Sequence, residues 1–175
     1  MLSFSRKADG GGSPADLAEL LDRTVMLAGS DYDLKKCRDF RQIEIVREYE
    51  PGLTPVVCQA GKIQQVFLNI LRNGAEAMMA IKDLGRTPRF VLRVAQDQGM
   101  VRVEIEDNGP GMDEATRRRV FEPFFTTKSG GAGIGLAVVA EIMQAHGGFV
   151  VLDNSASGAS LRLLFPMTRQ KGAAK

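Results

Sequence analysis

The feature that most constrains this chain is an amphipathic segment that runs from about residue 61 to residue 83. Its apolar residues recur at spacings of three and four, which is the period of one face of an α-helix. These residues are Ile63, Val66, Phe67, Ile70, Leu71, Gly74, Met78 and Ile81. Gly85 follows the segment and can end the helix. The pattern predicts a long helix that packs one face against another layer of the fold.

The opposite side of this predicted helix carries polar residues. Asn69 and Asn73 are four residues apart and Glu76 lies three further on, so all three project from one side. Amides have mediocre propensity in a helix interior, so two of them on one line require an explanation. One interpretation is an ordinary solvated face. The other is an edge that holds Mg²⁺ and phosphate, because an amide oxygen is a hard ligand for magnesium.

The rest of the chain predicts a mixed α/β protein. Alternating apolar residues indicate strands at 42–50, 90–95, 101–105, 149–152 and 160–165, the last four forming two hairpins. Helical spacing indicates further helices at 16–28, 113–120 and 134–146. Asp16 and Glu19 resemble a capping box at the start of the first helix. We expect a two-layer α/β (α+β) sandwich, in which a mixed, mostly antiparallel sheet packs on about three helices.

Composition excludes several classes of protein. A net charge of +2 argues against a dedicated nucleic-acid binder, which usually has a strongly basic face. The cysteines, Cys37 and Cys58, have no metal-ligand spacing, which favours a reduced, cytoplasmic compartment. No apolar run approaches 18 residues, so we expect no membrane segment in this chain, although a longer parent protein could be anchored.

Two glycine-rich turns carry further candidate chemistry. Asp107 ends a predicted strand and is followed by Gly109 and Gly111, so its carboxylate could accept from an amine such as adenine N6. The same turn could also be an ordinary Asx turn. The second cluster, 130–136, opens a predicted helix, where unpaired amides and the helix dipole favour phosphate. By itself it is also typical of a flexible loop, and the preceding residues 121–128 suggest a mobile lid.

In their order along the chain, these motifs resemble the boxes of the GHKL ATPase and kinase superfamily, and most closely those of sensor histidine kinases. The matching segments are NILRNGAEAM, DNGPGM, FEPFFTTK, GAGIGLAVV, HGG and SGASLRLLFP, and the resemblance covers roughly residues 15–167. The short lid is similar to that of the nitrogen-regulator branch. The resemblance implies a Bergerat-type ATP-binding fold and a catalytic domain that donates the γ-phosphoryl group of Mg-ATP to a histidine on another domain.

The resemblance also implies a role for each matching residue. Asn73 would coordinate Mg²⁺, Asn69 would support the phosphates, and Lys128 would act as a lid cation. Asp107 would bind adenine N6. The other residues expected around the nucleotide are Ala77, Gly109, Gly111, Met112, Phe125, Thr126, Thr127, Gly131, Ala132, Gly133, Ile134, Gly135, Leu136, Gly158 and Ser160.

Two positions depart from the family pattern. Glu76 stands where many relatives carry a basic residue, so one phosphate contact is expected to be missing or supplied by Lys128 or Arg72. Ala132 replaces the more usual hydroxyl residue, which removes one possible hydrogen bond to phosphate.

Two alternative functions remain open beside the kinase. ATP-driven clamps of the superfamily resemble one another in placing a glutamate four residues before the metal-binding asparagine, as a general base for water. Here that position is Asn69, and an amide cannot take the proton, although Glu76 lies nearby. The third reading is a nucleotide-binding module without transfer activity.

The phosphate acceptor is expected outside this chain. The single histidine, His146, precedes Gly147 at a helix end, where a partly cationic imidazole would cap the helix. In the family, the accepting histidine lies on a separate dimerisation helix. The resemblance therefore implies two partners, the dimerisation domain of the same kinase and the receiver domain of a response regulator, and a homodimeric parent. Arg117, Arg118 and Arg119 are interpreted as a solvated helix face, and the alternative is a docking patch for the dimerisation helices or a response regulator.

The expected organisation has three parts. Residues 1–14 would be a remnant of the dimerisation helix pair followed by a flexible, glycine-rich linker. Residues 15–168 would form the catalytic ATP-binding domain, and residues 169–175 a disordered tail. Such a fragment would not phosphorylate itself.

Overall fold

Five strands form one mixed sheet. The computed structural model describes residues 11–30, 40–81, 83, 85–127 and 135–167. The strand order is β2-β4-β5-β7-β6, in which β2 is parallel to β4 and every other pair is antiparallel. The strands are β2 Glu44–Tyr49, β4 Arg89–Asp97, β5 Met100–Asp107, β6 Phe149–Asn154 and β7 Ala159–Pro166. The predicted mixed, mostly antiparallel sheet is confirmed.

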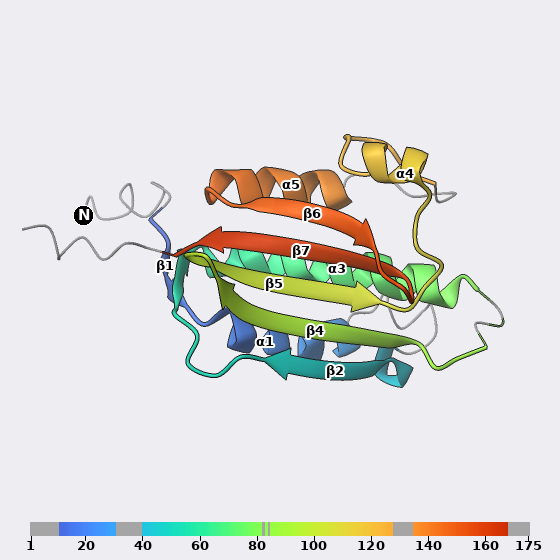
Figure 1. Ribbon diagram of the computed structural model, residues 1–175, viewed down its shortest axis with the longest axis horizontal. Coiled ribbons are helices and arrows are strands. Elements are labelled where there is room, and N and C mark those ends of the chain that lie inside the picture. Colours follow the sequence, from blue (N-terminus) through green and yellow to red (C-terminus); the bar gives the residue numbers. More distant parts are fainter. Residues whose placement is uncertain (1–10, 31–39, 82, 84, 128–134, 168–175) are drawn as a thin grey trace, which may run out of the picture.

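Three helices cover one side of this sheet. They are α1 Leu17–Ser30, α3 Ala60–Met79 and α5 Gly135–Ala145, and α3 lies between the other two (Figure 1). Phe90, Leu92 and Val94 of β4 are buried beneath them, whereas the alternate residues Val91 and Arg93 are partly exposed on the other face. The period-two pattern of the strands therefore separates a buried face of the sheet from a solvent-exposed one. The two-layer sandwich predicted from the sequence is confirmed.

Local signals explain the start of α1 and the central hairpin. Asp16 Oδ1 accepts hydrogen bonds from the backbone N–H groups of Ala18 and Glu19, over 2.9 and 3.1 Å, so the predicted N-cap is confirmed. The side chain of Glu19 pairs with Arg23 and does not complete a capping box. Between β4 and β5, Gln98 and its successor both have positive φ, which matches the twist of a two-residue hairpin turn.

Helix α3 is shorter than the sequence predicted. It ends at Met79, whereas the apolar spacing extended it to residue 83. Met78 is the last buried residue of the stripe, and Ile81 lies beyond the helix and is partly exposed. Further turns would have no apolar surface to pack on, and packing rather than propensity holds most helices in place. Gly85 does adopt positive φ, but it belongs to a separate turn in which its N–H donates to Asp83.

The N-terminal part of the described chain holds an unpredicted two-stranded sheet. β1 Ser13–Ala15 pairs antiparallel with β3 Val56–Cys58. Ser13 and Pro14 were expected to be linker, and strands of three residues are too short to show a period in the sequence. The predicted strand 42–50 also begins later, because Phe40–Gln42 form a 3₁₀ turn. The division at residues 14 and 168 stays a prediction, since residues 1–10 and 168–175 lie outside the described part.

The remaining elements follow their predictions closely. The short helix α4, Glu114–Arg119, is capped by Asp113, whose Oδ1 accepts from Thr116 N over 2.7 Å. The last hairpin, β6 and β7, extends beyond its predicted bounds at both strands. None of the described helices combines the length and the apolar character needed to cross a membrane.

Gly74 sets the distance between α3 and the sheet. A Cβ atom on this residue would lie 2.6 Å from Cε1 and 2.8 Å from Cζ of the Phe90 ring, and 3.3 Å from Oδ2 of Asp107. The absent side chain thus lets an aromatic ring of β4 pack directly on the helix backbone. This contact explains a glycine in a helix interior, where it is otherwise destabilising by about 1 kcal/mol relative to alanine.

We predict that Gly74→Ala destabilises the fold, because the added methyl group must displace a fully buried ring. Overpacking of this kind costs about 1–3 kcal/mol, and urea denaturation would measure the loss. Gly61→Ala is the matched control: it lies on the same helix, and a Cβ there meets nothing within 4 Å. The control should be neutral or stabilising by up to about 1 kcal/mol. Equal effects of the two substitutions would contradict this account.

Candidate functional site

A cavity of about 790 Å³ lies between α3, the turn after β5 and the segment that follows α4. Its size is in the range of small-molecule binding sites. Sequence-predicted residues that line it are Asn69, Asn73, Ala77, Asp107, Gly111, Met112, Phe125, Thr126, Thr127, Gly135 and Leu136. The structure therefore brings together residues from four separate motifs.

One wall of the cavity is the polar side of α3. Asn69, Asn73 and Glu76 line it together, as their helical spacing predicted. Asn69 Nδ2 donates a hydrogen bond to the backbone carbonyl of Gly135 over 3.2 Å, which ties α3 to the first turn of α5. The amide of Asn73 also lies beside this turn, since a Cβ on Gly135 would be 3.6 Å from its Nδ2. Two amides and a helix N-terminus thus meet at one end of the cavity.

The other end of the cavity holds the carboxylate of Asp107. Its Oδ1 accepts hydrogen bonds from Gly109 N over 2.9 Å and from Ala159 N over 3.4 Å. No described residue donates to Oδ2. Burial raises the pKa of Asp107 above its ordinary value, and the two backbone hydrogen bonds only partly oppose this. The site presents a half-satisfied, partly buried acceptor that suits a hydrogen-bond donor on a ligand.

Gly158 is required behind this carboxylate. A Cβ on Gly158 would lie 2.1 Å from the carbonyl oxygen of Asp107, so no larger residue fits without moving the backbone. The sequence placed Gly158 among the nucleotide-binding residues. The structure assigns it a supporting contact, in which it lets the turn between β6 and β7 approach the end of β5.

The segment after β5 is held by a residue that sequence reasoning passed over. Asn154 Oδ1 accepts from Met112 N over 3.0 Å, and its Nδ2 donates to Met112 O over 2.6 Å. The pair fixes Met112 at the cavity wall. Farther along, the Arg119 guanidinium lies 4.5 Å from the centre of the Phe125 ring, a cation–π contact that positions another lining residue. Arg119 therefore does more than form the solvated face that the sequence suggested.

Besides Gly158, two predicted residues do not line the cavity. Gly109 only supports Asp107 through its N–H group. Ser160 lies on the other face of the sheet, where its hydroxyl donates to Glu104 over 2.8 Å. Its neighbours Ala159 and Leu161 line the cavity instead, because successive side chains of a strand alternate between faces. The expected contact of Ser160 with the adenine end is therefore wrong in its placement.

Five of the predicted site residues lie outside the described residues. They are Lys128, Gly131, Ala132, Gly133 and Ile134. Lining residues that sequence reasoning did not assign to the site are Ile70, Gly74, Ala80, Ile81, Pro110, Thr116, Val120, Ala159 and Leu161. Most are apolar and were read only as core or as turn, so their sequence pattern carried no separate signal for a binding site.

His146 connects the end of α5 to the start of α3. Its Nδ1 lies 2.7 Å from the carbonyl oxygen of Ile142 and must donate to it, while Nε2 accepts from Gln59 N over 3.1 Å. The structural role predicted for this histidine is present. Its expected cationic character is wrong, because an imidazole that accepts at Nε2 is the neutral tautomer.

Comparisons with known proteins agree with this geometry. The family model described as "Histidine kinase-, DNA gyrase B-, and HSP90-like ATPase" matches residues 58–169. The sensory histidine kinase/phosphatase NtrB of Rhizobium meliloti (strain 1021) is 33% identical over 166 residues, which are 89% of this chain and 42% of NtrB. This chain thus spans less than half the length of that relative.

Solved structures show the same arrangement. The mycobacterial sensor histidine kinase MprB superposes with a TM-score of 0.69 at 28% identity, covering 89% of this chain and 97% of that one. Full-length ShkA, solved in complex with AMPPNP, superposes with a TM-score of 0.69 at 25% identity, covering 90% of this chain and 32% of that one.

The raised pKa of Asp107 predicts an unusual pH dependence of stability. A carboxyl group whose pKa is raised by folding stabilises the fold below its unfolded pKa of about 3.9. That contribution is lost as the pH rises through the higher folded pKa. Asp107→Asn, which does not ionise, should therefore gain stability relative to the wild type as the pH rises from about 4 to 7.

Urea denaturation over this pH range measures the difference. Asp113→Asn is the control of opposite sign, since the hydrogen bond from Thr116 N lowers the pKa of Asp113. At pH 7 the free energy of unfolding of the wild type should exceed that of the Asp113→Asn variant, and this difference should shrink as the pH falls. A stability difference for Asp107→Asn that stays constant with pH would contradict the burial argument.

Proposed function

This chain belongs to the histidine kinase-, DNA gyrase B- and HSP90-like ATPase family as a histidine kinase catalytic domain, and we propose that it passes the γ-phosphoryl group of bound ATP to a histidine on a separate domain. The receiving histidine would lie on a dimerisation domain of the same, homodimeric parent protein. An aspartate on a response regulator would then take the phosphoryl group, in the cytoplasm. The observation that carries the proposal is the pairing of a partly buried acceptor, Asp107, with an amide-lined helix N-terminus across one cavity.

Adenine would occupy the Asp107 end of the cavity. Oδ2 of Asp107 has no donor among the described residues, and the exocyclic N6 amine of adenine supplies one. The apolar lining of this end, including Ile70, Met112 and Leu161, suits a flat aromatic base. The AMPPNP in the similar structure of ShkA supports a nucleotide in a site of this kind.

The phosphates would lie at the opposite end, beside the first turn of α5. Helix α5 has 11 residues, and its N-terminal residues Gly135 and Leu136 line the cavity. Unpaired N–H groups and the helix dipole at such an end favour a negatively charged ligand. On α3, Asn69 hydrogen-bonds to Gly135 and the amide of Asn73 lies beside it.

The residues at this end fit magnesium only together with phosphates. No group of three His, Cys, Asp or Glu side chains that could hold a metal occurs within the described ranges. Mg²⁺ usually takes one or two protein oxygens and completes its octahedron with waters and phosphates. The amide oxygen of Asn73 would hold the ion, and the carboxylate of Glu76 lines the same wall of the cavity. When bound, the ion would neutralise charge on the phosphates.

Transfer to a partner is better supported than hydrolysis. Asn69 occupies the position of the water-activating glutamate in ATP-driven clamps, its Nδ2 is held by Gly135 O, and an amide cannot accept a proton. The phosphoryl group would therefore wait for an acceptor. Phosphoryl transfer depends mainly on positioning and charge neutralisation, which this cavity can provide without a base of its own.

The metal assignment predicts the behaviour of Asn73→Ala. Titration with an ATP analogue should show that Mg²⁺ strengthens binding to the wild type, and that Asn73→Ala loses at least about tenfold of this gain. Gln65→Ala removes an exposed amide from the same helix, outside the cavity, and should bind like the wild type. Equal, metal-independent affinity of the wild type and Asn73→Ala would remove Asn73 from the metal site.

A second prediction concerns the acceptor. This chain contains one histidine, His146, and both of its ring nitrogens are hydrogen-bonded. Incubated alone with γ-labelled ATP, the chain should remain unlabelled, while addition of the dimerisation domain of its parent should produce an acid-labile label on that domain. A stable phosphohistidine at His146 would refute the proposal that the acceptor lies elsewhere.

A further inference from the structure

Arg86, in the connection between α3 and β4, joins the two turns that flank Asp107. Its Nε and Nη2 atoms both donate to the carbonyl oxygen of Asn108, over 3.1 and 2.7 Å. Nη2 also donates to the carbonyl oxygen of Ser157 over 2.7 Å, and to that of Gly109 over 3.4 Å. One guanidinium group therefore ties the turn after β5 to the turn between β6 and β7.

The carboxylate of Asp107 depends on both of these turns. Its Oδ1 accepts one hydrogen bond from each of them, from Gly109 N and from Ala159 N. Relative movement of the turns would shift one donor against the other and rotate the carboxylate. We propose that Arg86 is a positioning residue that holds the two turns together, so that Asp107 presents Oδ2 to the nucleotide base. This inference rests on the proposed function of the cavity.

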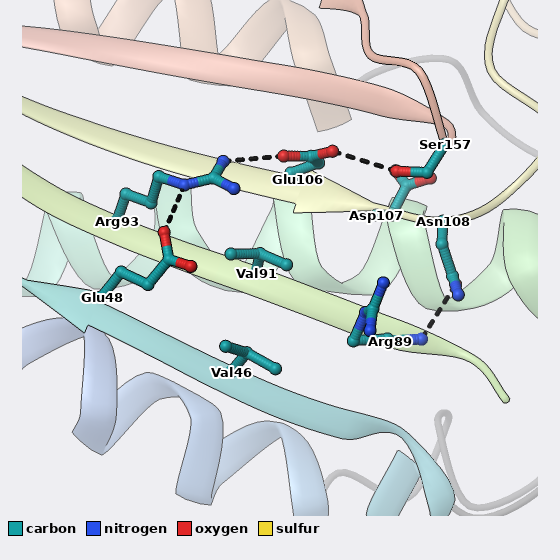
Figure 2. Close-up of a pocket in the computed structure, with 9 residues that line it drawn as sticks. All are labelled: Val46, Glu48, Arg89, Val91, Arg93, Glu106, Asp107, Asn108 and Ser157. Atoms are coloured by element: carbon teal, nitrogen blue, oxygen red, sulfur yellow. Dashed lines mark hydrogen bonds and ion pairs between the residues drawn. The ribbon is translucent and has the colours of Figure 1, made fainter.

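Other contacts attach each turn to the sheet separately. Asn108 is buried, and its side chain accepts from Arg89 N over 2.9 Å and donates to Thr87 O over 2.8 Å. On the outer face of the sheet, Ser157 Oγ donates to Glu106 Oε1 over 3.0 Å, and Arg93 Nη1 donates to Glu106 Oε2 over 2.7 Å (Figure 2). These anchors should keep the fold intact without Arg86. The bridge between the two turns is what its removal would loosen.

The shape of the guanidinium group, rather than its charge, carries this role. Arg86 is exposed and does not line the cavity, so it acts on the base through Asp107. A lysine would keep the positive charge, but its single ammonium group cannot reproduce a planar fork of donors. If Arg86 acted only by attracting the nucleotide phosphates through its charge, Arg86→Lys would bind nucleotide like the wild type. The positioning role predicts that Arg86→Lys and Arg86→Ala are both defective.

Calorimetric titration with Mg-ATP and Mg-ITP separates these cases. ITP carries an oxygen where adenine has its N6 amine, so it cannot donate to Asp107 from that position. Both Arg86 variants should lose affinity for ATP by about tenfold, or about 1.4 kcal/mol, with little change for ITP. The wild-type preference for ATP should therefore disappear. Arg89→Ala removes a cation three residues along the chain, on the outer face, and should keep that preference.

Four results would overturn the proposal. One is that Arg86→Lys keeps the wild-type preference for ATP. Another is that the variants lose affinity for ATP and for ITP equally, as a general loss of structure would cause. Circular dichroism of each variant monitors folding, and Arg86→Lys decides the question if Arg86→Ala does not fold. A wild type that binds neither nucleotide would overturn the proposed function together with this inference. A normal wild-type preference with unchanged Arg86 variants would overturn the inference alone.

Discussion

The packing of α3 on the inner face of the sheet is the contact on which the rest of this structure depends. The helix approaches so closely that the Phe90 ring lies against its backbone at Gly74, with no side chain between them. The same approach brings Asp107, at the end of β5, within reach of the helix. The contact that closes the hydrophobic core thus also creates one end of the ligand cavity. Core and site therefore share residues.

The two ends of the cavity offer different interactions to a ligand. At one end a carboxylate is partly buried, and its desolvation is only partly offset by two backbone donors. That arrangement weakens the isolated fold at neutral pH and strengthens recognition of a donor that completes it. At the other end, the amide side chains of Asn69 and Asn73 and the N-terminus of α5 offer partial charges. In the proposed function, phosphate would be held there by these dipoles.

The parts of the fold that the sequence predicted are those with long periodic signals. The stripe from Ile63 to Met78 and the alternation around Phe90 and Val103 gave the correct element types and the correct layers. Prediction failed for shorter features. The three-residue strands β1 and β3 have no period, and α3 ends where its packing surface ends. Ser160 was assigned to the wrong face, because motif matching identifies a segment but not which of its alternating side chains point inward. Arg86 and Asn154 carried no motif at all.

The sequence by itself determined the order of the motifs, the amphipathic faces and the chemistry of Asn69, Asn73 and Asp107, because these depend on residue type and local spacing. It also determined that the single histidine stands at a helix end. Only the tertiary structure decided that His146 is neutral, since its partner, Gln59 N, lies 87 positions away. Likewise, Arg86 meets Ser157 across 71 positions. Such contacts depend on how the elements pack, and a pattern of local periods cannot contain that information.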